Sequence, residues 1–204
     1  MSKKLRQNEP IYVAPEIKGS LDDNHFAHVR DERNGQDLDP YNIEHKIEIY
    51  KRQVHGWFLE PAENLVNEPN NGFIVLMICM SYYEGIESYR TGQLTHNASK
   101  NAFVKTLERM YLKRYSLKNL KVLYSEARCG LFHNGMTEGK IVISLDYTNP
   151  IEFVNIEFVN NGIIKINQKL LLEDIKKDFD EYIRLLSTDI TLRDNFSKMF
   201  TILF

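Results

Sequence analysis

Apolar side chains recur at helical spacing from residue 42 to about residue 131, and this run limits the fold more than any other feature of the sequence. In its first part the apolar positions lie alternately four and three residues apart, which places them on one helix face. They are Ile43, Ile47, Tyr50, Val54 and Trp57. The pattern predicts a first helix from Asn42 to about Leu59, with Pro61 marking its end. Further helices are predicted over residues 73–90, over residues 97–115 and from residue 117 onward.

After Gly139 the spacing of apolar residues changes from helical to extended. Short runs rich in β-branched and aromatic residues are separated by turn-forming residues, which is typical of small strands. The runs cover residues 141–145, 151–159 and 163–166. Asn161-Gly162 predicts a tight hairpin, and helical spacing returns over residues 169–186 and again over residues 192–204.

These patterns predict a mainly α fold. Its centre is a four-helix bundle over residues 42–136, and residues 137–204 add a small antiparallel β-hairpin or sheet and C-terminal helices that pack on the bundle. Residues 1–41 are polar, contain three prolines and two glycines, and show no sustained periodicity. We therefore expect a loosely ordered arm at the N-terminus.

The overall charge is nearly balanced, with 26 Lys and Arg against 28 Asp and Glu, so no global basic field attracts nucleic acid. Any RNA-binding surface must be local or assembled from two chains. The sequence begins without the apolar stretch of a signal peptide, and its longest apolar run, residues 73–80, is too short to span a bilayer. With only two cysteines, the chain is expected in the cytoplasm, without membrane contact. No residues at a recognised zinc spacing suggest a metal, and no other cofactor is expected.

Reactive side chains concentrate in residues 128–135, RCGLFHNG. Arg128 offers a planar fork of donors for phosphate oxygens, and His133 carries an imidazole, the side-chain group best suited to moving protons near neutral pH. Cys129 adds a thiol between them. Together these groups could hold and cleave a phosphodiester. The alternative is an exposed arginine and a histidine that merely interacts with the negative end of a helix dipole.

Helix geometry limits how Arg128 and His133 can meet. Five residues at about 100° each place them about 140° apart around a regular α-helix. Gly130 between them, and the turn-forming pair Asn134-Gly135 after them, could let the final turn unwind and bring His133 toward Arg128. Alternatively, two copies of the helix meet across a two-fold axis, so that each cleft uses residues from both chains.

The helix over residues 97–115 concentrates basic side chains on one face, beside two tyrosines, and is a candidate nucleic-acid surface. The basic residues are Lys100, Lys105, Arg109, Lys113 and Arg114. An ordinary solvated helix exterior is the alternative. Glu84 and Glu87, at the polar end of the helix over residues 73–90, are candidates for setting the protonation state of His133. Ordinary surface carboxylates are the alternative for these two.

A late bundle helix that carries Arg, four intervening residues and then His followed by Asn resembles the HEPN superfamily, the higher eukaryotes and prokaryotes nucleotide-binding domains. Arg128, His133 and Asn134 match this motif, and the resemblance covers about residues 42–136. The surrounding sequence is similar to uncharacterised bacterial members. The chain departs from the pattern at Cys129, where many active members have Asn, Asp or His directly after the arginine.

The resemblance implies a metal-independent endoribonuclease that acts as a homodimer, often in a toxin–antitoxin or phage-defence system. His133 would serve as general base or acid, Arg128 would neutralise charge on the phosphorane, and Asn134 would orient the imidazole or bind phosphate. The residues expected to assist substrate binding are Cys129, Glu84, Glu87, Lys113 and Arg114. RNA is the expected substrate, and an antitoxin or another regulatory protein is an expected partner. Cys129 favours the alternative, a non-catalytic HEPN-like module that binds RNA, a nucleotide or another protein.

Overall fold

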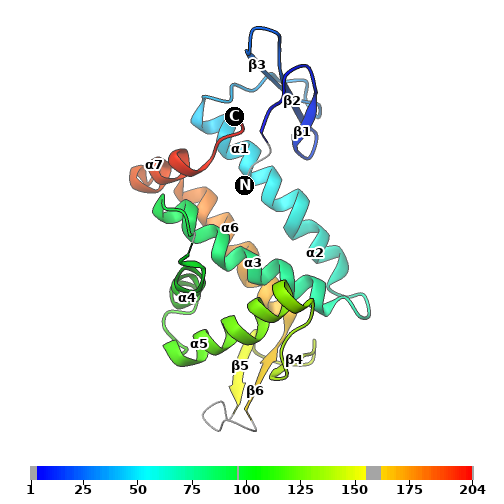
Figure 1. The fold of residues 1–204 in the computed structure, drawn as a ribbon, viewed down its shortest axis with the longest axis vertical. Helices are drawn as coiled ribbons and strands as arrows, with labels where there is room; N and C mark the ends of the chain where they lie inside the picture. The colour runs from blue at the N-terminus through cyan, green and yellow to red at the C-terminus, as the bar shows by residue number, and fades with distance from the viewer. Residues whose placement is uncertain (1–3, 96, 155–161, 204) are drawn as a thin grey trace. The chain divides into compact units, whose positions relative to one another are not determined.

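The computed structural model describes residues 4–95, 97–154 and 162–203, and helices account for most of its regular structure. The helices are α1 (Ile43–Val54), η1 (His55–Leu59), α2 (Glu60–Leu65), α3 (Gly72–Thr91), α4 (Ser99–Met110), α5 (Leu117–Leu123), η2 (Tyr124–Asn134), α6 (Gln168–Leu185) and α7 (Ile190–Met199), as drawn in Figure 1. The strands are β1 (Ile11–Ala14), β2 (Ile17–Leu21), β3 (Ala27–Asp31), β4 (Ile141–Ile143), β5 (Ile151–Val154) and β6 (Ile163–Ile166). The segments η1 and η2 are π-helical. The predicted mainly α class, with some β structure, is confirmed.

Contacts divide the chain into two compact units. Unit 1 contains Met1–Pro61, Tyr89–Gln93 and Tyr182–Phe204, and unit 2 contains Ala62–Ser88 and Leu94–Glu181. Helix α1 therefore belongs to unit 1, whereas α4, α5 and η2 belong to unit 2. The four-helix bundle expected over residues 42–136 stays a prediction.

Residues 11–31 form a three-stranded antiparallel sheet in unit 1, in the order β1-β2-β3, instead of the expected loosely ordered arm. Val13, Ile17 and Val29 are buried on one face, whereas Lys18 and Arg30 alternate with them and are not. Each strand has only four or five residues, so the alternation is too short to stand out from its polar flanks. Tertiary packing, rather than local periodicity, selects these strands.

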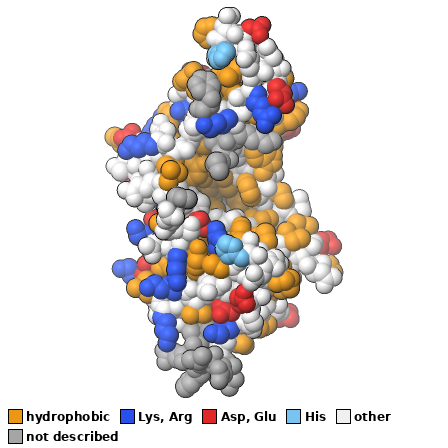
Figure 2. Space-filling model, viewed as in Figure 1, with side chains coloured by type: hydrophobic (Ala, Val, Ile, Leu, Met, Phe, Trp, Pro, Cys, Tyr) orange, Lys and Arg blue, Asp and Glu red, His pale blue; other side chains and the backbone are white. Residues whose placement is uncertain are grey.

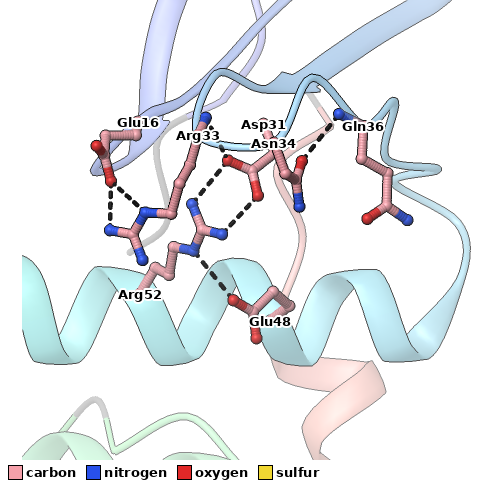
Figure 3. A network of polar contacts seen from close by, with 7 residues as sticks. All are labelled: Glu16, Asp31, Arg33, Asn34, Gln36, Glu48 and Arg52. Atoms are coloured by element: carbon pink, nitrogen blue, oxygen red, sulfur yellow. Dashed lines mark hydrogen bonds and ion pairs between the residues drawn. The ribbon is translucent and has the colours of Figure 1, made fainter.

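A charge network joins β3 to α1, as Figure 3 shows. Arg52 on α1 donates two hydrogen bonds to the carboxylate of Asp31, one of them 2.9 Å from Nη1 to Oδ1. The Asp31 side chain is only 3% exposed, and the hydrogen bonds from Arg52 lower the pKa of its carboxyl below the ordinary value. Arg52 also donates to Glu48, at 3.0 Å, and Arg33 pairs with Glu16 nearby. Because an unpaired buried charge is costly, the Arg52–Asp31 pair fixes the sheet on the helix.

Aromatic rings from distant parts of the sequence form the core of unit 1. The ring centroid of Tyr50 on α1 lies 4.4 Å from that of Tyr89, 5.4 Å from that of Phe196 and 5.6 Å from that of Phe200. Burial raises the pKa of Tyr89 to about 12, so its hydroxyl stays neutral over the physiological pH range. Such rings bury large apolar areas, and they tie α7 to α1.

The first predicted helix begins at Asn42 as expected but does not end at Pro61. The Asn42 side chain accepts a hydrogen bond from the backbone N–H of Glu44, at 2.9 Å, and caps α1. The chain then continues through η1 into α2, and Pro61 is the second residue of α2. A proline ring clashes with the carbonyl four residues earlier in a regular α-helix, and here the residue four positions before Pro61 lies in the wider, π-helical η1.

The helices of unit 2 share a partly buried polar layer. Arg109 on α4 forms an ion pair with Asp178 on α6, and the Asp178 carboxylate also accepts a hydrogen bond from Tyr82 on α3, at 2.7 Å. Tyr111 donates to Asp174 on α6, at 3.0 Å. Arg109 therefore turns away from the basic face expected on this helix, because a poorly exposed carboxylate holds it.

The second sheet also belongs to unit 2 and has the strand order β4-β6-β5. Strands β5 and β6 pair antiparallel, as predicted, whereas β4 pairs parallel to β6. The sheet is therefore mixed, because strand direction depends on the connections rather than on the strand sequences. The predicted turn at Asn161-Gly162 reaches outside the described residues. Helix α6 confirms the helix predicted over residues 169–186, and α7 covers Ile190–Met199 instead of residues 192–204.

Candidate functional site

The segment that carries the Arg128–His133 motif is a π-helix rather than the end of a regular α-helix. Helix α5 begins after its cap Ser116 and becomes η2 at Tyr124. Hydrogen bonds in a π-helix join residues five apart, so Arg128 and His133 are one hydrogen-bonded step apart. The expected unwinding of the last turn is replaced by a widening of the whole segment from Tyr124 to Asn134.

Two glycines shape the end of η2. Gly135 has a φ of 72°, the left-handed conformation that ends a helix, as predicted. Gly130 lies under the returning chain, and a Cβ atom there would be 2.7 Å from the carbonyl oxygen of Met136 and 2.9 Å from the nitrogen of Glu138. The Glu138 N–H donates to the carbonyl of Glu126 at 2.9 Å. This hydrogen bond holds residues 136–138, called here the return, against η2. Gly130 therefore permits a close backbone approach, and the helix continues through it rather than unwinding there.

An open pocket of about 530 Å³ lies where the chain after Gly135 folds back beside η2. It brings together three of the predicted residues, Cys129, His133 and Asn134. Its other lining residues are Ser125, Glu126, Glu138, Gly139 and Lys140. The pocket thus combines a thiol, an imidazole, a carboxamide and an ammonium group, with His133 and Asn134 exposed to solvent.

Both carboxylates of the pocket are engaged by neighbouring groups. Glu126 accepts a hydrogen bond from the backbone N–H of Lys140, at 3.3 Å, and its carboxylate lies 3.8 Å from the Lys140 Nζ. Glu138 accepts a hydrogen bond from the Asn134 side chain, at 2.7 Å. The contact with Glu138 orients the Asn134 side chain, whereas the imidazole of His133 is exposed and is chemically suited to proton transfer.

Arg128 does not line this pocket but points toward α3. Its guanidinium forms an ion pair with Glu84, 2.9 Å from Nη2 to Oε2, and both side chains are 19% exposed. The guanidinium carbon also lies 4.6 Å from the ring centroid of Phe132 and 5.8 Å from that of Tyr124. Glu84, expected to act on His133, therefore pairs with Arg128.

The remaining predicted site residues lie outside the pocket. Lys113 and Arg114 are exposed in the connection between α4 and α5, and Arg114 donates to Asn149 at 3.4 Å. Lys113 follows Leu112, and both have positive φ, so α4 ends earlier than the predicted helix. Glu87 is half-buried on α3 and does not line the pocket.

The pocket residues that were not predicted from the sequence are Ser125, Glu126, Glu138, Gly139 and Lys140. Ser125 precedes Cys129 by four residues, the spacing of neighbours on a helix face. This spacing could have predicted that Ser125 lies beside Cys129. Glu138 and Lys140 come from a return of the chain that local sequence does not encode. Among the residues that the structure describes, no group of three His, Cys, Asp or Glu side chains is arranged to hold a metal ion.

Comparisons with models of protein families, with curated proteins and with solved structures found no match to this chain. Over the described ranges, no helix combines the length and the apolar character needed to cross a bilayer.

Proposed function

We propose that this chain is a metal-independent endoribonuclease of the HEPN type that acts as a homodimer on RNA. The observation that carries the proposal is the open pocket in which the exposed His133 and Asn134 lie beside Lys140. An imidazole is suited to proton transfer, and an ammonium group and a carboxamide are suited to phosphate oxygens.

In the proposed reaction His133 removes the proton from a ribose 2′-hydroxyl, and the 2′-oxygen forms a new bond to phosphorus. The bond from phosphorus to the 5′-oxygen breaks, and the departing oxygen takes a proton from an imidazolium, supplied by His133 of the second protomer. The products are a 2′,3′-cyclic phosphate and a 5′-hydroxyl. Arg128 contributes positive charge to the phosphorane once RNA competes with Glu84 for its guanidinium.

Cleavage of a labelled RNA by the purified chain in the presence of a chelator tests this proposal. We expect His133→Ala to abolish cleavage, and His28→Ala, an exposed histidine of the N-terminal sheet, to retain it. Arg128→Ala alone leaves Glu84 without its ion-pair partner. The double variant Arg128→Ala/Glu84→Ala therefore serves as the second test. Full activity in both the His133 variant and the double variant would overturn the assignment.

A second candidate function is a HEPN-like module that binds RNA, a nucleotide or another protein without cleavage. The ion pair between Arg128 and Glu84, partly covered by Phe132, favours it because this arginine is not presented to the pocket. RNA binding that persists without cleavage under every condition supports this alternative.

Toxin–antitoxin or phage-defence activity, a cytoplasmic location and a regulatory partner such as an antitoxin are further parts of the ribonuclease proposal. Induced expression in bacteria tests the first. The wild-type chain is expected to slow growth, and the His133→Ala variant is not.

A further inference from the structure

A line of side chains spaced by four residues runs along α5 and η2 into the pocket. Ser125, Cys129 and His133 all line the pocket, so this face of η2 is the pocket face. Lys121 lies four residues before Ser125, and Lys118 lies three residues before Lys121. Residues three and four apart are neighbours on a helix surface. The two lysines therefore extend the pocket face toward the start of α5.

Both lysines are exposed, and neither forms an ion pair within the part of the chain that the structure describes. Lys113 and Arg114, also exposed, precede them in the connection between α4 and α5. Figure 2 shows Lys and Arg side chains gathered over α4 and α5 on the face in view. The surface beside the pocket is therefore locally basic, although the whole chain has a formal net charge of −2.

The two carboxylates that line the pocket do not cancel the charge of these lysines. Glu126 is paired with Lys140, and Glu138 accepts from Asn134, so each is already engaged inside the pocket. Arg109, on the preceding helix, is held by Asp178 and adds nothing to the exposed face. The exposed cations next to the pocket face in the sequence are those of the connection and of α5.

We propose that Lys113, Arg114, Lys118 and Lys121, called here the basic track, bind successive phosphates of a single RNA strand that enters the pocket along α5. This inference rests on the proposed function and names how its substrate is held. A single strand fits better than a duplex, because a narrow line of cations follows one backbone and because the strand must bend freely at the scissile phosphate.

Exposed leucines beside the basic track suggest a second possible ligand, a lipid surface, which the test must distinguish from RNA. Leu112 is 89% exposed and Leu117 is 51% exposed. Leucines flanked by lysines also suit an anionic lipid surface. RNA is favoured because the track leads into a polar pocket that holds an imidazole and a carboxamide, which a membrane surface does not need.

The experiment measures binding of a fluorescently labelled oligouridine to the His133→Ala chain over a series of salt concentrations. Adding Lys118→Gln and Lys121→Gln is expected to weaken binding about tenfold and to reduce the slope of log affinity against log salt by about 1.4, since each contact to a single strand contributes about 0.7. The matched control, Lys169→Gln with Lys177→Gln on α6, is expected to change affinity less than about twofold. The charge-retaining pair Lys118→Arg with Lys121→Arg is expected to keep the affinity.

Equal affinities of the track variant and the control would overturn the inference, and so would a loss of binding to phosphatidylserine vesicles with oligouridine binding unchanged. Cleavage by the wild-type chain, measured in parallel, separates this inference from the proposed function. If the chain cleaves RNA equally well with and without Lys118 and Lys121, the inference about the basic track is refuted and the proposed function is not. If binding depends on the two lysines but no cleavage is detected, the inference is supported and the ribonuclease proposal is refuted.

Discussion

Arg128 and Glu84 form an ion pair of 2.9 Å that links η2 to α3, and the ring of Phe132 lies 4.6 Å from the guanidinium carbon. The pair is neither fully buried nor freely solvated, since each side chain is 19% exposed. The arginine of the motif is therefore part of the packing of unit 2 in this conformation.

This position predicts coupling between the two residues in stability. Glu84→Ala and Arg128→Ala are each expected to lower the free energy of unfolding by about 1–3 kcal/mol, because each leaves a poorly exposed charge without its partner. The double variant is expected to lose less than the sum of the two, by about 1 kcal/mol. Urea unfolding of the four proteins measures this cycle. Strictly additive losses would show that the ion pair does not stabilise the fold.

Gly130→Ala is expected to destabilise the chain by about 1–3 kcal/mol, because the added methyl group meets the backbone of the return at 2.7 Å. Gly85→Ala is the matched control, since Gly85 lies within α3 and a Cβ atom there has no neighbour within 4 Å. That substitution is expected to stabilise by about 0.5–1 kcal/mol. Thermal unfolding of both variants checks the opposite signs. A neutral Gly130→Ala would mean that the return is not closely packed on η2.

Long periodic segments were the part of the fold that the sequence could predict. Helices α3 and α6 appear within one residue of the ranges predicted for them, because their apolar stripes are long and face a core. The N-terminal sheet could not be predicted in the same way. Its strands are short, and the contact of Asp31 with Arg52 joins residues far apart in the sequence.

The same distinction between local features and tertiary contacts applies to the candidate site. Cys129, His133 and Asn134 could be predicted to lie together, because they are close neighbours on one helical segment. The partner of Arg128 and the contribution of Lys140 could not, since both depend on tertiary contacts. The π-helix itself has no strong local signal, because the same residues also suit a regular α-helix.

Asp31→Asn is expected to lower the free energy of unfolding by about 3 kcal/mol at pH 7, because Arg52 then faces a neutral amide. The pKa of Asp31 is lowered in the folded chain, mainly by its hydrogen bonds from Arg52. The contribution of Asp31 to the free energy of unfolding is therefore fully present at a pH above its pKa in the unfolded chain, about 3.9. This contribution is lost as the pH falls through the lower pKa of Asp31 in the folded chain. The difference between wild type and variant should shrink below about pH 4 in urea titrations.

The control for this pH dependence is Asp37→Asn, which removes the partner of Arg30 in a pair whose side chains are 62% and 82% exposed. An exposed ion pair contributes little, and we expect a change below about 1 kcal/mol. A gap between wild type and Asp31→Asn that stays constant from pH 7 to pH 3 would contradict the role assigned to the Arg52–Asp31 pair.

The two cysteines are expected to differ in reactivity. Cys79 is fully buried, and burial raises its thiol pKa well above the ordinary value, whereas Cys129 is partly exposed in the pocket. Iodoacetamide should therefore modify Cys129 in the native chain and Cys79 only after unfolding. Peptide mass spectrometry locates the label. Equal labelling of both thiols under native conditions is the outcome that this arrangement forbids.

The core of unit 1 is completed by residues far along the sequence, because Tyr50 packs against Phe196 of α7 and against Phe200, which directly follows α7. The described segments of unit 2, including the pocket of η2, all precede Tyr182. On a ribosome, the pocket can therefore assemble while Tyr50 of α1 still lacks its partners Phe196 and Phe200. Contacts between residues so far apart in the sequence form slowly, so the aromatic core of unit 1 is complete only after α7 has emerged.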